Sequence, residues 1–336
     1  MQLHSLNFDI RSRSIEFGDW PDRLYRSNDL SAEFPSHVSS LQLEVERANS
    51  PHAFDIAPIT SDNGVFAEIP LSGGMCYYSR GRFYSECDGE FRSKTEFTPA
   101  SGRIRMNVAG RFDNTPSNAL LGLVVKPIMQ SFVLPFFKLK SLHGAVIARD
   151  EKTIMLTGRG GAGKSTTALS FMRRGYALLS DDTALFTYCD DRAVALSSLD
   201  CAHVTAATLR VLPFLKAAVV GDMDHRGKFT VAPFDLQPSE SWGEPRAITH
   251  FVELSRKPVD APRFVEIDPA PAAAALIGEA MTVFRHAAFA GNEIFDRHAQ
   301  LSFDVVTALM RDARSLRLEF DNHQLDALPK LFDELE

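Results

Sequence analysis

The stretch that decides the fold runs from Leu142 to Leu185 and reads LHGAVIARDEKTIMLTGRGGAGKSTTALSFMRRGYALLSDDTAL. At its centre, residues 158–165 (GRGGAGKS) match the phosphate-binding loop pattern G-x-x-x-x-G-K-[ST] without a gap. Glycines permit the positive φ angles of such a loop and let backbone N–H groups approach a polyphosphate closely. The pattern therefore predicts a binding site for a nucleoside phosphate.

Each residue type of this loop has a task in that interpretation. Lys164 supplies a positive charge for the outer phosphates, and the Ser165 hydroxyl can ligate Mg²⁺. The helix that follows directs its free N–H groups and its positive end at the anion. The predicted nucleotide-binding residues are Gly158, Arg159, Gly160, Gly161, Ala162, Gly163, Lys164, Ser165 and Thr166.

The sequence on both sides of the loop supports this interpretation. Residues 153–157 (TIMLT) predict a short buried strand, and residues 166–174 predict a helix that ends at Gly175. A strand, a glycine loop and a helix in this order are the context that a phosphate-binding loop requires. The alternative is a glycine-rich turn that binds no ligand.

Two adjacent carboxylates follow the next predicted strand, residues 176–179. Ligands of open α/β sheets gather at strand ends, which places Asp181 and Asp182 near the phosphates. One carboxylate can hold Mg²⁺, and the other can accept the proton of an attacking hydroxyl. Because neighbouring residues of a strand point to opposite faces, we expect the two aspartates to have different roles. The alternative is a solvated turn or a helix cap.

Together these features resemble the catalytic domain of HPr kinase/phosphorylase. The resemblance rests on Leu142-His143-Gly144 before a hairpin, on the phosphate loop and on the Asp-Asp pair one helix later. It implies ATP and Mg²⁺ as cofactors, Asp181 as general base, Asp182 as metal ligand beside Ser165, and His143 as a nearby active-site residue. On the sequence alone, a single histidine before a strand is more often structural, and the active-site role of His143 is what the resemblance implies. The resemblance also allows a homo-oligomer, which the residue pattern does not decide.

Two features differ from the pattern of that family. Thr166 stands where the family usually has an acidic residue, and the Arg-Gly-Leu-Gly signature tied to phosphorylase activity is not found. The chain is more similar to the HPr-kinase-related proteins found beside peptide-modification genes. Some of those proteins phosphorylate a serine of a lasso-peptide precursor.

A charged loop further along the chain, DMDHRGKF at residues 222–229, supplies candidate cations. Charge spreads over the oxygens of a phosphoryl group during its transfer, so a kinase needs cations besides the loop lysine. Arg226 and Lys228 are the candidates. A solvated hairpin tip explains the same residues.

The composition and the N-terminal sequence indicate which binding partners and which cellular compartment to expect. A formal net charge of −7 and the lack of a basic run argue against a nucleic-acid partner. The N-terminus has no apolar core of signal-peptide length, and Lys126, Pro127, Gln130 and Pro135 interrupt the apolar segment 119–137. We therefore expect that segment to form a buried, kinked helix, and we expect a cytoplasmic protein without membrane contact.

The sequence predicts an α/β protein in two domains. Residues 1–115 predict a β-rich N-terminal domain with a small antiparallel sheet, and residues 116–336 predict a phosphate-loop kinase domain of the HPr-kinase/PEP-carboxykinase-like type. Within the second domain we expect helices over residues 206–215 and 325–335. Further helical residues include Arg285, His286, Arg297 and His298, and we expect most of these four to be surface charges and one to be a candidate contact to phosphate or base.

The predicted function is transfer of the γ-phosphoryl group of ATP to a hydroxyl. The favoured acceptor is a serine of a peptide or protein, such as a ribosomally made peptide precursor. The alternatives are a small-molecule hydroxyl kinase and a non-catalytic nucleotide-binding module of a peptide-modification pathway.

Overall fold

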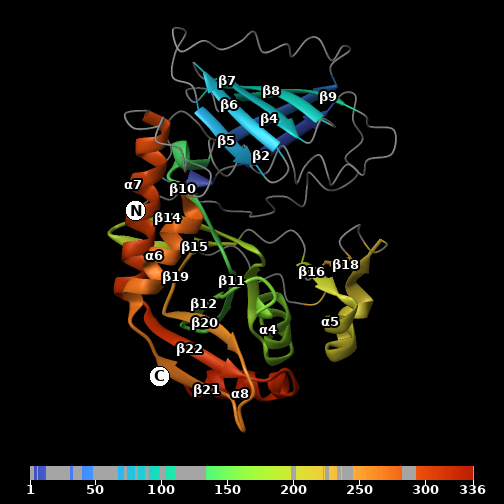
Figure 1. The fold of residues 1–336 in the computed structure, drawn as a ribbon, viewed down its shortest axis with the longest axis vertical. Coiled ribbons are helices and arrows are strands. Elements are labelled where there is room, and N and C mark those ends of the chain that lie inside the picture. The colour runs from blue at the N-terminus through green and yellow to red at the C-terminus, as the bar shows by residue number, and fades with distance from the viewer. Residues whose placement is uncertain are drawn as a thin grey trace. The chain divides into compact units, whose positions relative to one another are not determined.

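The structure is a computed structural model, and it describes residues 4–5, 7–12, 31–32, 40–47, 67–71, 74–79, 82–87, 91–98, 103–110, 134–197, 202–221, 223, 227–232, 236, 245–281 and 293–335. The chain divides into two compact units (Figure 1). Unit 1 is Met1–Asp22, Asn28–Lys140 and Ala280–Phe303, and unit 2 is Arg23–Ser27, Ser141–Glu279 and Asp304–Glu336. The predicted boundary after residue 115 lies outside the described residues and stays a prediction, as does most of the predicted helix over 119–137. Of the helices that are described, none is both long and apolar enough to cross a membrane.

Unit 1 contains a seven-stranded sheet in the order β2-β4-β9-β8-β7-β6-β5. Strands β5 to β9 form an antiparallel meander, whereas β4 runs parallel to both β2 and β9. The expectation of a purely antiparallel sheet is therefore wrong. Parallel neighbours need a long connection, and strands β5 to β8 lie between β4 and β9 in the chain. The strands of unit 1 are β1 (His4–Ser5), β2 (Asn7–Ser12), β3 (Ser31–Ala32), β4 (Ser40–Arg47), β5 (Ala67–Leu71), β6 (Gly74–Ser79), β7 (Arg82–Cys87), β8 (Phe91–Thr98) and β9 (Arg103–Gly110).

Unit 2 is built on a six-stranded sheet in the order β13-β11-β12-β20-β22-β21. Both β12 and β13 are antiparallel to β11, so they run in the same direction, and β20 and β22 are parallel to β12. The carboxyl ends of β12, β13 and β20 therefore lie at one edge of the sheet. The strands are β11 (Ala145–Arg149), β12 (Lys152–Thr157), β13 (Ala177–Ser180), β20 (His250–Arg256), β21 (Arg263–Glu266) and β22 (Arg314–Phe320).

Helix α4 (Lys164–Phe171) follows the glycine loop and packs against β11, β12 and β13, as Figure 1 shows in green. Its Ala168, Leu169 and Phe171 are fully buried in the core with Leu156 and Leu178. A short 3₁₀ helix, η7 (Met172–Arg174), continues it until Gly175 ends it at a φ of 78°. The predicted strand, loop, helix and stop are thus present, and the α/β class is confirmed.

Two smaller sheets have the strand orders β10-β14-β15-β19 and β16-β18-β17. The helix predicted over 206–215 is shorter than expected. It ends at Val211, because Leu212 leaves helical geometry before Pro213 starts a 3₁₀ helix. The remaining elements are η6 (Leu134–Phe137), β10 (Leu139–His143), β14 (Thr183–Cys189), β15 (Arg192–Leu196), β16 (Ala202–Thr205), α5 (Ala206–Val211), η8 (Pro213–Ala218), β17 (Val219–Val220), β18 (Lys228–Val231), β19 (Arg246–Ala247), α6 (Pro269–Ala280), α7 (Glu293–Asp312), η13 (Asn322–Ala327) and α8 (Leu328–Asp333).

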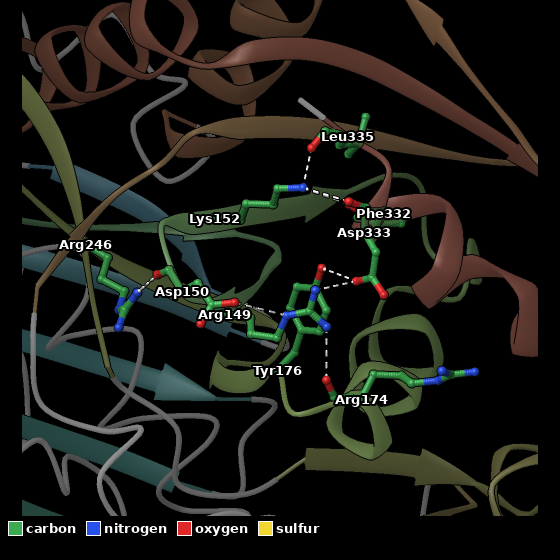
Figure 2. A network of polar contacts seen from close by, with 9 residues as sticks. All are labelled: Arg149, Asp150, Lys152, Arg174, Tyr176, Arg246, Phe332, Asp333 and Leu335. Atoms are coloured by element: carbon green, nitrogen blue, oxygen red, sulfur yellow. Dashed lines mark hydrogen bonds and ion pairs between the residues drawn. The ribbon is translucent and has the colours of Figure 1, made fainter.

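The end of the chain is tied to the β11–β12 hairpin by the polar network of Figure 2. Arg149 donates to Asp333 Oδ1 at 2.6 Å and to the Arg174 carbonyl at 3.1 Å, and its guanidinium lies 4.3 Å from the Tyr176 ring centroid. Lys152 Nζ donates to carbonyls at the end of α8, among them that of Asp333 at 3.1 Å. The helix predicted over 325–335 is instead the pair η13 and α8, with Pro329 in the first turn of α8.

Candidate active site

The glycine loop connects β12 to α4 through three glycines with positive φ. The φ angles are 145° at Gly158, 80° at Gly161 and 93° at Gly163, which is the N-cap of α4. A Cβ at Gly158 would lie 3.0 Å from the Leu254 carbonyl oxygen, whereas a Cβ at Gly160 or Gly161 would meet nothing within 4 Å. The loop is therefore closely packed where it leaves the strand and open in its middle.

The N-terminus of α4 is left free for an anion. No side chain caps it, and its first turn has no acidic residue. The N–H groups of the first helical turn have no partner within a helix, and the first N–H with a backbone acceptor is that of Thr167, bonded to the Gly163 carbonyl at 2.8 Å. Lys164 Nζ donates to the Gly158 carbonyl at 2.7 Å. This combination of free N–H groups, a lysine and open space suits a phosphate chain.

Asp181 and Asp182 lie in a bend between β13 and β14, so the expectation that they point to opposite faces of a strand is wrong. The Thr183 N–H donates to the Asp181 carbonyl at 2.7 Å, and Asp182, the residue between them, has a φ of 64°. A turn closed in this way around a residue with positive φ is rare and strained. Strain of this kind is concentrated at functional sites, where the surrounding structure enforces it. Nor is β13 the direct neighbour of β12, because β11 lies between them.

The Asp181 carboxyl group is enclosed. Its Oδ1 atom is buried and has no hydrogen-bond partner among the described residues. Burial raises the pKa of Asp181 to about 6, while hydrogen bonds from the Ser165 side chain and from the backbone of Asp182 and His203 act in the opposite direction. A carboxylate with this pKa beside the loop serine has the properties of a general base near neutral pH.

Asp182 is the exposed member of the pair, with 61% of its side chain accessible. His143 Nδ1 lies 2.8 Å from the Asp182 carbonyl oxygen and 3.6 Å from its Oδ1. The Asp182 carbonyl also accepts the Gly144 N–H at 3.1 Å. His143 therefore contacts Asp182 and holds the bend against the start of the β11–β12 hairpin.

The ionisable groups around Lys164 show which predicted residues come together. Burial lowers the pKa of Lys164, and the nearby carboxylates of Asp182, Glu279 and Asp181 oppose this shift. Lys228 is close enough to lower the same pKa. Sequence reasoning missed Glu279, which lies at the end of α6, because nothing in an alanine-rich helix marks one glutamate as facing the loop.

The other predicted residues are placed as follows. The Thr166 hydroxyl lies 2.9 Å from the Thr208 hydroxyl, so this side chain faces α5. Ala162 donates its N–H to the Arg159 carbonyl at 3.0 Å and closes a turn within the loop. Lys228 pairs with Thr205 across β16 and β18. Arg226 lies outside the described residues.

One cation at the loop was not predicted. Arg256 is the last residue of β20, and its Nη1 donates to the Gly161 carbonyl at 3.1 Å. The guanidinium also covers Gly163, because a Cβ there would lie 3.5 Å from the Arg256 Nε. No signal in the sequence marks Arg256, because its position at the loop depends on which strand pairs with β12.

The donor set fits a magnesium ion shared with a nucleotide. A hydroxyl and a carboxylate are ligands that Mg²⁺ takes beside substrate phosphates, and Ser165 and Asp182 provide them. The buried Oδ1 of Asp181 is an acceptor left without a partner among the described residues. No group of three or more His, Cys, Asp or Glu side chains in the described part of the chain forms a metal site by itself. Mg²⁺ in nucleotide sites is usually bound by one or two protein ligands together with substrate phosphates.

Comparison with known proteins points to one family over a short segment. No family model matches the chain. Two HPr kinase/phosphorylases, from Limosilactobacillus reuteri (strain DSM 20016) and Limosilactobacillus reuteri subsp. reuteri (strain JCM 1112), are each 46% identical to it over 43 residues. This segment is 13% of the chain and 13% of each curated relative.

A comparison with solved structures finds a protein whose name is related to that of the curated relatives. The structure of the Hpr(Ser) kinase/phosphatase from Coxiella burnetii aligns with 58% of this chain and 94% of its own, at 12% identity and a TM-score of 0.29. That TM-score is too low to support an argument about the fold. The resemblance to HPr kinase/phosphorylase that the sequence predicts is confirmed, over a segment that spans 13% of the curated relatives' length.

Proposed function

We propose that this chain is an ATP- and Mg²⁺-dependent kinase that transfers the γ-phosphoryl group to a hydroxyl, with a serine of a peptide or protein as the favoured acceptor. The observation that carries the proposal is the enclosed Asp181 carboxyl beside Ser165, at the same edge of the sheet as the glycine loop. A site that only bound nucleotide would need no buried base next to the loop serine.

The loop binds the nucleotide in this proposal. The triphosphate lies against the amides of residues 158–166, and Lys164 exchanges its bond to the Gly158 carbonyl for the outer phosphates. Ser165 and Asp182 would hold Mg²⁺, which would supply positive charge to neutralise the phosphates.

The transfer itself exchanges one P–O bond for another. The acceptor oxygen attacks the γ-phosphorus, the bond from that phosphorus to the β–γ bridging oxygen breaks, and ADP leaves. The hydroxyl proton passes to the Asp181 carboxylate. Lys164 and Lys228, together with Arg226, neutralise the charge that spreads over the transferred oxygens. His143 supports the bend that carries both aspartates.

Removing the base tests this proposal. In Asp181→Asn, we expect the turnover number for phosphoryl transfer to fall about 10²–10⁴-fold, because the acceptor proton loses its base, while MgATP still binds in calorimetry. Asp182→Asn should instead raise the Mg²⁺ concentration needed for half-maximal activity. Asp190→Asn is the control, because Asp190-Asp191 is a second Asp-Asp pair with positive φ in an exposed hairpin turn.

The assay uses labelled ATP with serine-containing peptides and, separately, hydroxylated metabolites. Transfer to metabolites alone would favour the small-molecule kinase, and bound but unconsumed ATP would favour the non-catalytic module. Full transfer activity in Asp181→Asn contradicts the assignment of the base. A wild-type chain that binds no MgATP contradicts the whole proposal.

A further inference from the structure

The peptide unit that joins Gly161 to Ala162 is held at both ends. Its carbonyl oxygen accepts a hydrogen bond from Arg256 Nη1 at 3.1 Å, and its N–H donates to the Arg159 carbonyl at 3.0 Å. This peptide unit lies in the open middle of the glycine loop, between two glycines with positive φ. Reversal of this unit would change ψ at Gly161, which glycine tolerates, and φ at Ala162, so only one of the two flanking residues resists it sterically.

The sheet register explains why Arg256 reaches the loop. β12 and β20 are paired in parallel up to Thr157 and Glu253, and β20 continues three residues further, from Leu254 to Arg256. Gly158 is packed against Leu254 at the start of this extension. The next residue, Lys257, forms an ion pair with Glu319 at 2.5 Å. Of these two neighbouring cations, Arg256 is the one that contacts the loop.

The positive charge of Arg256 lies at the N-terminus of α4, where the helix dipole is also positive. It covers Gly163, the N-cap of α4, and cations at the positive end of a helix are unfavourable unless an anion is present. No carboxylate in the described part of the chain forms an ion pair with Arg256, and the first turn of α4 contains no acidic residue. The negative charge of a bound polyphosphate would offset this unfavourable interaction between Arg256 and the N-terminus of α4.

We propose that Arg256 is a positioning residue of the phosphate loop, an inference that rests on the proposed nucleotide site. Its guanidinium keeps the Gly161 carbonyl turned away from the cradle. In the reversed orientation this carbonyl oxygen would face the phosphates and repel them. Arg256 touches the loop carbonyl rather than the transferred group, so it orders the site without taking part in the transfer.

Three variants and the wild type test this inference. Arg256→Ala removes the bond, Arg256→Lys keeps a charge and one donor, and Arg246→Ala is the matched control. Arg246 also donates from Nη1 to a turn carbonyl far away in the sequence, that of Asp150 at 2.5 Å, which belongs to the β11–β12 hairpin (Figure 2). MgATP and MgADP are titrated into each protein by calorimetry, and thermal unfolding and the kinetics of transfer are measured in parallel.

We expect Arg256→Ala to weaken MgATP and MgADP by the same factor, about tenfold or more, as for the loss of a charged hydrogen bond. KM for ATP should rise while kcat stays close to that of the wild type, and Arg256→Lys should recover most of the affinity. Arg246→Ala should bind nucleotide like the wild type.

The outcomes separate this inference from the proposed function. Wild-type affinity in Arg256→Ala overturns the inference and leaves the kinase proposal intact. A loss of kcat larger than the change in KM, or a larger loss for ATP than for ADP, assigns Arg256 to the transferred phosphate and overturns the positioning role. A fall in unfolding temperature that accounts for the weaker binding also overturns it. If the wild type binds neither nucleotide, the proposed site itself fails.

Discussion

A buried lysine–histidine pair in unit 1 shows how far the environment of a single residue can change its chemistry. Lys140 and His298 are each 2% exposed, and Lys140 Nζ lies 2.7 Å from His298 Nε2. Both groups also lie near the Ala280 carbonyl, at 3.4 Å and 3.0 Å. Burial lowers the pKa of Lys140 to about 7. His298 is therefore buried and is not one of the surface charges that we expect for most of this group.

This pair predicts an unusual dependence of stability on pH. Below pH 7, Lys140 is protonated in both states, whereas between about 7 and 10.5 the unfolded chain binds the proton and the folded chain does not. The free energy of unfolding should therefore rise with pH in this window, by up to about 1.4 kcal/mol per pH unit from this group.

Urea unfolding at pH 7, 8 and 9 measures that slope. In Lys140→Met the contribution is absent, so the difference in stability between the wild type and this variant should change steadily with pH. Lys138→Met, which changes an exposed lysine two residues away, should keep the slope of the wild type. Equal slopes in the wild type and Lys140→Met would contradict a lowered pKa at Lys140.

At the scale of elements, the glycine loop owes its shape to the strand and helix that hold it. Gly158 has a φ of 145° and lies against Leu254, so the start of the loop is fixed by β20. Gly160 has no positive φ and no neighbour within 4 Å of a Cβ. Two glycines of one motif therefore differ in what they contribute to folding.

The two glycines should respond differently to alanine. Gly158→Ala forces a side chain into a strained conformation 3.0 Å from a carbonyl oxygen, and we expect it to lower the free energy of unfolding by about 1–3 kcal/mol. Gly160→Ala should leave the folded structure as stable as the wild type. Chemical denaturation of both variants checks this, and equal stability of the two would contradict the packing of Gly158 described above.

Secondary-structure elements whose sequence signals lie within the element itself were predictable from the sequence. The apolar run before the loop gives β12, the glycines give the turn, and Gly175 ends the helix, because each signal lies within the element it determines. The two aspartates were placed correctly after β13, but the bend that carries them was only the alternative, because the strand pattern does not show the positive φ that Asp182 adopts. Predicted helices were too long where a proline, such as Pro213, interrupts them.

Contacts between distant segments could not be predicted in the same way. Arg256 reaches Gly161 only because β20 pairs with β12, and these residues are 95 positions apart. The approach of Glu279 to Lys164 and the burial of Lys140 against His298 also depend on which elements pack together. The sequence therefore located the loop and its acids, whereas the supporting residues required the fold.

At the scale of the whole molecule, unit 2 by itself contains the described residues of the candidate site. Its sheet brings the carboxyl ends of β12, β13 and β20 to one edge, which places the glycine loop, the aspartate bend and Arg256 near one another. The network around Arg149 and Asp333 secures the end of the chain on the β11–β12 hairpin (Figure 2). The domain boundary after residue 115, the homo-oligomer and the cytoplasmic location stay predictions.

The most direct measurement is a crystal structure of the full chain with Mg²⁺ and a non-hydrolysable ATP analogue. The account predicts a triphosphate lying on the amides of residues 158–166, with its terminal phosphate between Lys164 and the bend that carries Asp181 and Asp182. It also predicts that the Gly161 carbonyl still accepts from Arg256. An analogue bound away from the glycine loop, or a terminal phosphate directed away from both aspartates, would contradict the account.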